Sequence, residues 1–200
     1  MAKTYDNTIV EEEVSLAIER LLIANSTNTY NPETDGKIDI DTPPTGFTDV
    51  GAVVEDSPTL TVTREKYQLR LGLPRALQYE QIIGVDGEFA VVVWAKSNDV
   101  VAQALGVDAV TCTIATNVTR VPFGRTTIKK YGIIGIADFV DGTQVVHYFD
   151  EVSVKPEYSE NIRPDEAGRI MMGFDCYSHI STIHGDERIV GERFYFNTTV

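Results

Sequence analysis

The feature that most constrains the fold is an alternation of apolar and polar residues along positions 60–94. Apolar side chains stand at or near every second position, which is the period of a strand with one buried face. They are Leu60, Val62, Ile82, Val85, Phe89, Val91 and Val93. Residues 72–75 (Gly-Leu-Pro-Arg) interrupt the pattern, because proline has no N–H for a strand ladder and glycine favours turn geometry. We therefore predict a hairpin with an exposed tip.

The period changes after Trp94. Ser97 or Asn98 can cap a helix and Asp99 would lie in its first turn, while Val100, Val101, Ala104 and Leu105 share one helical face before Gly106. This pattern predicts a helix of about two turns over residues 97–106, docked on the sheet by its apolar face.

Taken in order, these segments resemble the tail tube (major tail) proteins of long-tailed, non-contractile bacteriophages. The resemblance lies in the succession GFTDVG (46–51), EDSPTLTVT (55–63), a proline-containing hairpin, DGEFAVVVWA (86–95) and NDVVAQALG (98–106). It covers about a third of the chain, and its specificity lies in the order of the segments. The later, strand-rich part agrees in outline.

The resemblance implies a virion structural protein and no enzyme or cofactor. The expected fold is a single domain over residues 1–200, a mainly β sandwich or barrel of about eight strands with one short α-helix, an extended loop and terminal arms. Hexameric rings would stack into a tube that conducts DNA through its lumen without specific binding. Expected partners are further copies and the tape measure, terminator and distal tail proteins. The protein would be made in the host cytoplasm and reside in the phage tail. A tail-completion or distal tail protein of similar fold, forming one ring, is the alternative.

The remaining sequence adds further strands. A hairpin is predicted from residues 131–140 and 144–154, because Asp141-Gly142 supplies the positive φ values of a turn between two β-branched and aromatic runs. Residues 109–121 read as a strand or a broken strand pair. Residues 169–180 alternate with a core face of Ile170, Met172, Phe174 and Cys176, and residues 193–196 form a last strand or a C-terminal arm.

The N-terminal region is open between two structures. Val10, Val14, Ala17, Ile18, Leu21 and Leu22 fit a helical stripe, whereas residues 19–24 also read as a strand, which would leave residues 1–18 as a possible arm. Residues 25–45 hold few apolar groups and three of the eight prolines, so we predict an exposed loop there.

The excursion over residues 64–80 is more apolar than an exposed hairpin should be. Its large side chains are Tyr67, Leu69, Leu71, Leu73, Leu77 and Tyr79. Either they pack on their own domain or they are buried against another copy. The resemblance implies the second, as an inter-ring stacking loop.

The chain carries 17 basic against 30 acidic side chains, a formal charge of −13, which makes free nucleic acid and anionic membranes poor partners. In a ring, acidic residues that face the channel would repel the passing DNA and prevent it from binding to the wall. The alternative is that the negative charge only keeps the protein soluble before assembly. No stretch approaches 18 apolar residues and the N-terminus has no apolar signal core, so we expect neither membrane insertion nor a signal peptide.

One weak metal-binding pattern is present. Cys176, His179 and His184 have a spacing that could hold zinc and leave a coordination position open, which defines a small metal-dependent enzyme as the alternative of another class. The alternative is that these histidines simply lie at a strand end and in a turn and bind no metal. Cys112 and Cys176 read as buried free thiols, and lone His147 reads as packing. No nucleophile, phosphate-loop or metalloprotease motif appears.

Overall fold

The computed structural model describes residues 4–15, 18–25, 30–71, 76–94, 113–115, 118–119, 129–140, 142–155, 159–163, 166–180 and 188–197. These residues are mainly β, as predicted, with a single helical turn, α1 (Pro32–Asp35). The strands are β1 (Thr4–Ser15), β2 (Arg20–Asn25), β3 (Thr48–Ala52), β4 (Thr59–Leu71), β5 (Ala76–Trp94), β6 (Thr113–Ala115), β7 (Val118–Thr119), β8 (Lys130–Asp138), β9 (Gln144–Val154), β10 (Ser159–Arg163), β11 (Glu166–Cys176), β12 (His179–Ile180), β13 (Arg188–Ile189) and β14 (Glu192–Phe196).

Six of these strands close into a barrel. Antiparallel pairing runs β5-β11-β9-β8-β2-β3, and β3 returns to β5 through a bridge between Val53 and Val93. The N–H of Val54 donates to the carbonyl of Val92 at 2.8 Å, which continues the closure. Closure removes the free edges of these strands where they meet, so the barrel is a complete unit.

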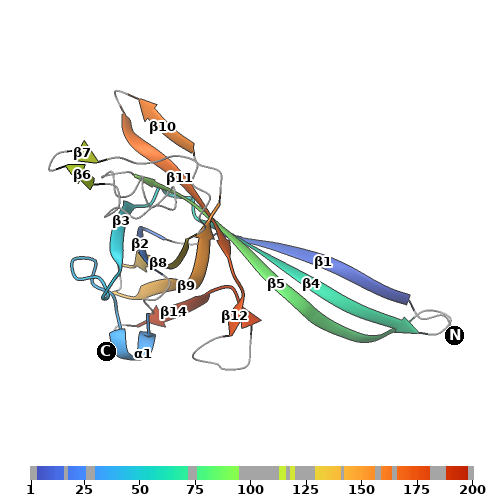
Figure 1. Cartoon of the computed structure of the whole chain (residues 1–200). Helices are drawn as coiled ribbons and strands as arrows, with labels where there is room; N and C mark the ends of the chain where they lie inside the picture. Colours follow the sequence, from blue (N-terminus) through green and yellow to red (C-terminus); the bar gives the residue numbers. More distant parts are fainter. Residues whose placement is uncertain are drawn as a thin grey trace.

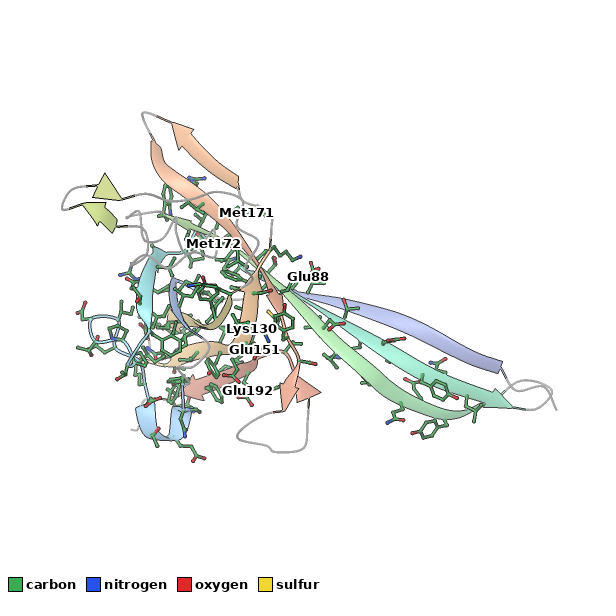
Figure 2. All side chains as sticks on the ribbon, viewed as in Figure 1. Glu88, Lys130, Glu151, Met171, Met172 and Glu192 are labelled. Atoms are coloured by element: carbon green, nitrogen blue, oxygen red, sulfur yellow. The ribbon has the colours of Figure 1, made fainter. Side chains whose placement is uncertain are left out.

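The barrel interior is filled by side chains from alternate strand positions. Phe89 stacks on Phe149 and on Phe174, with ring centroids 5.0 and 5.9 Å apart. The predicted core face of β11 is confirmed, because Ile170, Met172, Phe174 and Cys176 are all buried whereas Met171 is exposed. Figure 2 marks the neighbouring residues Met171 and Met172 on this strand.

A second apolar cluster lies on the outside of β2, β8 and β9. Leu22, Ile134 and Val146 point away from the barrel interior and are covered by Tyr30, Ile38 and Phe47. Most of residues 30–45 are exposed as predicted, but Tyr30 and Ile38 are buried. The prediction of a loop without a core role was therefore wrong at these two positions, because isolated apolar anchors do not produce a periodic signal.

Gln144 joins this outer layer to the barrel. Its side chain is fully buried, accepts a hydrogen bond from the N–H of Ile38 at 2.7 Å and donates to the carbonyl of Ile38 at 2.8 Å. A second donation reaches Asp138 at 2.9 Å. The side-chain amide thus pairs with the N–H and C=O of Ile38 as a neighbouring strand would. Without it these two backbone groups would be buried without hydrogen-bond partners.

A three-stranded arm leaves the barrel on one side (Figure 1). It consists of the hairpin β4-β5 with β1 paired along the outer edge of β4, from Thr4 opposite Arg70 to Ser15 opposite Thr59. The predicted hairpin is confirmed, and its tip, residues 72–75, lies outside the described residues. The prediction of a helix near the N-terminus was wrong in the described residues. The predicted N-terminal arm is the strand β1, and β2 is the first strand of the barrel.

The other predicted strands are present as well. β8 and β9 form the predicted hairpin, closed by a loop in which Gly142 has a φ of 83° and donates to the carbonyl of Phe139. β6 and β7 are the broken pair, and β14 is a strand on β9. The predicted helix at 97–106 lies outside the described residues. In the described part of the chain, no helix has the length and apolar character needed to cross a membrane.

Candidate assembly surface

The arm is anchored at its base and separates from the barrel beyond it. Leu60, Val62 and Val85 pack against the interior cluster, and beyond them neither core cluster includes an arm residue whose side chain the structure describes. At the base, Lys155 forms an ion pair with Glu88 of β5 and lies 3.9 Å from Asp175 of β11. Figure 2 shows Glu88 where the arm meets the barrel. The base is therefore held by the barrel, whereas the described contacts of the outer part are made within the arm itself.

The two faces of the outer arm differ in chemistry. On one face the register places Leu69 opposite Tyr79, and the rings of Tyr67 and Tyr79 make an edge contact at 6.5 Å. On the other face Lys66 forms an ion pair with Glu80 at 3.2 Å, and Gln68 donates to Glu80 at 3.1 Å. A strand ribbon normally buries one face in a core, yet Tyr79 and Glu80, which lie on opposite faces, are both exposed.

The residues predicted to make contact between copies are distributed along this arm. Tyr67, Leu69 and Tyr79 share the aromatic face, and 49% of Tyr79 is exposed. Leu71 and Leu77 lie on β4 and β5 by their backbones, and Leu73 falls outside the described residues. Tyr79 contacts Tyr67 and Gln81 of its own arm and keeps half of its surface exposed, so burial of these residues against another copy stays a prediction.

The arm also has two open strand edges. β1 pairs with β4 on one side and with no other described strand, and β5 gains its second neighbour, β11, from Gly87 onward. Residues 76–86 of β5 therefore present N–H and C=O groups that no described strand pairs. Such edges are templates for another chain, and soluble monomers normally cover or shorten them.

A groove of about 650 Å³ lies on the barrel near the turn between β8 and β9. Ile40 and Phe139 contribute apolar surface to it, and 47% of Phe139 is exposed. Asp39, Asp41 and Asp138 add carboxylates to its lining. The groove joins residues that are about 100 positions apart in sequence, so no local sequence pattern indicates it.

The metal-site candidate gains no support from the described residues. The side chain of Cys176 is 3% exposed and belongs to the barrel interior, where burial raises the pKa of its thiol to about 12. A protonated thiol is a poor ligand, since zinc binds the thiolate. His179 lies on β12 by its backbone, and His184 lies outside the described residues. No group of three potential metal ligands occurs in the part of the chain that the structure describes.

Buried polar side chains of the outer layer serve the fold. Tyr148 donates to Asp150 at 2.8 Å and accepts from the N–H of Tyr30 at 3.3 Å. Burial, with the hydrogen bond to Asp150, raises the pKa of Tyr148 well above its ordinary value. A phenol held protonated in this way is no general base at neutral pH, so the arrangement stabilises the covering segment.

No protein-family model matches the chain, and no curated protein matches it at a significant level.

Proposed function

We propose that this protein is the tail tube protein of a long-tailed, non-contractile bacteriophage. Copies would form hexameric rings that stack into a hollow tube, and genomic DNA would pass through it during delivery to the host. The single observation that carries the proposal is an arm whose two edges are paired by no described strand and on which Tyr79 and Ile82 are about half exposed, attached to a barrel with a buried core of its own.

The energetics of the arm favour a partner of the same kind. Tyr79 and Ile82 are each about half exposed, and burying such a side chain fully is worth about 1–2 kcal/mol. In a tube this burial would be repeated at every contact within and between rings. Its free energy would add to that of the backbone hydrogen bonds formed between paired strand edges. A structural protein made in many identical copies can use both terms at each contact.

The charge of the chain supports a role as a conduit. With a formal charge of −13, the protein repels DNA on average, and repulsion between exposed charges acts within about 10 Å at physiological salt. A tube wall of this composition would let DNA slide without binding to it. The order of sequence segments that resembles tail tube proteins points to the same use.

Electron microscopy of the purified protein at increasing concentration tests the proposal. We expect stacked rings and hollow tubes, and a chain with residues 71–77 replaced by an Asn-Gly turn should give folded protein without tubes. Single rings that never stack would favour the tail-completion or distal tail alternative. A monomer that stays dispersed at millimolar concentration would rule out a tube-forming protein.

A further inference from the structure

The place where the arm leaves the barrel is marked by a residue without a side chain. β5 runs unbroken from the arm into the barrel (Figure 1), and Gly87 is the first of its residues that pairs with β11. In that row Gly87 lies between Val62 of β4 and Cys176 of β11. Outward from this row, β5 is paired with β4 and with no other described strand. Gly87 therefore lies at the root of the arm.

The missing side chain makes room for Val190. A Cβ on Gly87 would lie 3.1 Å from both Cβ and Cγ2 of Val190 and 3.2 Å from Cβ of Cys176, which is closer than the optimal separation of carbon atoms. Val190 is 7% exposed and belongs to the interior cluster, together with Cys176. Gly87 is thus a socket that Val190 fills at the root of the arm.

Gly191 confines the same segment from the other side. A Cβ on Gly191 would lie 2.6 Å from Cδ1 of Phe149 and 3.0 Å from the carbonyl oxygen of Tyr148, both on β9. Residues 190–191 therefore fill the space between the root of the arm and β9, and an added methyl group would overpack either contact. Because interiors packed to this density transmit displacements, the position of this segment affects the position of the root.

The two ends of this segment are tied to strands of the barrel side. Residue 189 pairs with β12 in the short sheet of β12 and β13, and residues 192–196 pair with β9 along β14. Moving residues 190–191 away from Gly87 would disturb backbone hydrogen bonds on both sides. The segment is therefore a fixed support against which the root of the arm packs.

We propose that residues 190–191 form a wedge that sets the direction in which the arm leaves the barrel, with Gly87 as the socket for Val190. Both are positioning residues, because they act on assembly through the direction of the arm. An arm held in one direction loses less conformational freedom when it binds a second copy, which lowers the free-energy cost of association. The packing carries the positioning role by itself, whereas its use in tube formation rests on the proposed function.

Distances between spin labels measure the direction of the arm in the dilute, unassembled protein. Labels are attached through Gln81→Cys in the arm and Glu55→Cys in the turn between β3 and β4, two exposed positions. The parent chain for this experiment carries Cys112→Ala and keeps Cys176, whose thiol is buried. We expect a single narrow distribution of distances. Val190→Ala should broaden it by at least about twofold, because the cavity left by the two methyl groups allows the arm to tilt.

Val50→Ala is the matched control. It removes the same two methyl groups from the same interior cluster, but on β3, whose bridge to β5 lies at Val93 inside the barrel. The control should lower the stability of the chain to a similar extent and leave the distribution of label distances unchanged. Loss of stability alone therefore does not reproduce the effect expected for Val190→Ala.

Gly87→Ala changes the contact in the opposite sense. The added methyl group overfills the socket, so the mean label distance should shift. Combining Gly87→Ala with Val190→Ala moves a methyl group from the wedge to the socket, and the mean distance should return toward that of the parent chain. If the two residues contributed only to the stability of the barrel, the combination would not restore the distance.

Tube formation gives a second readout. Val190→Ala should raise the concentration at which tubes form by at least about fivefold, because the binding copy must then fix the direction of the arm. Val50→Ala should leave this concentration within about twofold of the unmodified value, since the arm keeps its direction. Light scattering measures the threshold, and circular dichroism confirms that both variants are folded.

The two readouts fail separately. A distance distribution as narrow in Val190→Ala as in Val50→Ala would overturn the wedge, whether or not tubes form. If the unmodified protein forms no tubes under any condition, the proposed function is wrong, and the label distances still decide whether residues 190–191 position the arm. Broadened distances with equal tube thresholds in the two variants would show that assembly does not use the wedge.

Discussion

The barrel and the arm are built from the same alternating strands but differ in what covers them. In the barrel, Phe89, Ile133 and Phe174 are completely buried by the other strands of the same chain. In the arm, Tyr79 and Ile82 remain half exposed, although they lie on β5, the strand that also carries Phe89. One strand of nineteen residues thus passes from a fully buried position at Phe89 to half-exposed positions at Ile82 and Tyr79. The difference shows that burial here follows from the barrel's closure and not from the hydrophobic pattern of a single strand.

The comparison predicts the largest effect for the barrel's aromatic stack. Phe89→Ala removes a ring that contacts both Phe149 and Phe174, so we expect a loss of about 3–5 kcal/mol in the free energy of unfolding. Tyr79→Ala in the arm should change it by less than about 1 kcal/mol, because half of the side chain is exposed and its described contacts, with Tyr67 and Gln81, lie within the arm. Urea unfolding of dilute samples measures both. Equal losses would mean that the arm packs on the barrel in solution.

The second prediction concerns the attachment of the outer layer. Gln144→Ala leaves the N–H and C=O of Ile38 buried without partners, and we expect a loss of about 2–3 kcal/mol. Gln81→Ala, at an exposed arm position, is the matched control and should cost less than about 0.5 kcal/mol. Urea denaturation curves of the two variants test the difference. A Gln144→Ala chain as stable as the control would show that the segment 30–47 is held by other contacts.

Much of the barrel could be predicted from the sequence, because its strands carry local signals. The alternation in β11 indicates a strand and its buried face, and the Asp-Gly turn indicates the hairpin of β8 and β9. Both signals are contained in short stretches of sequence. The order of strands in the barrel and its closure at Val53 and Val93 depend on pairings between distant segments. The groove escaped prediction for the same reason, since Ile38 and Gln144 meet only after folding. The helical stripe near the N-terminus was misleading because β1 pairs along β4 throughout its length, which overrides a weak local pattern.

A third prediction compares two glycines. A Cβ on Gly135 would lie 2.5 Å from Cδ1 of Ile18 in the barrel, so Gly135→Ala should overpack the core and cost about 1–3 kcal/mol. A Cβ on Gly84 in the arm would lie 3.6 Å from Cβ of Glu65, an ordinary contact, so Gly84→Ala should be nearly neutral. Thermal unfolding distinguishes them. A destabilised Gly84→Ala chain would indicate an arm packed more tightly than its exposure suggests.

The smallest expected effect is a dependence of stability on alkaline pH that belongs to the barrel. Burial raises the pKa of Cys176 from 9.0 to about 12, so the unfolded chain loses this proton first as the pH rises. The stabilisation is fully present below pH 9 and is lost progressively above it; between pH 9 and pH 10 the loss is about 1 kcal/mol. In Cys176→Ala this part of the decline should be missing, although the variant starts from a lower stability. Parallel declines for the two chains, measured by urea unfolding at each pH, would place the thiol in contact with water.

In the proposed tube another copy, and not the chain's own barrel, covers the arm. Hydrogen exchange of backbone amides measures this directly when it is compared at low and high protein concentration. We predict that the amides of residues 76–86 that point away from β4 exchange rapidly in the dilute protein and become protected as tubes form, while β8 and β9 stay protected throughout. Arm amides that are protected equally at every concentration, or that remain unprotected in the concentrated protein, would contradict it.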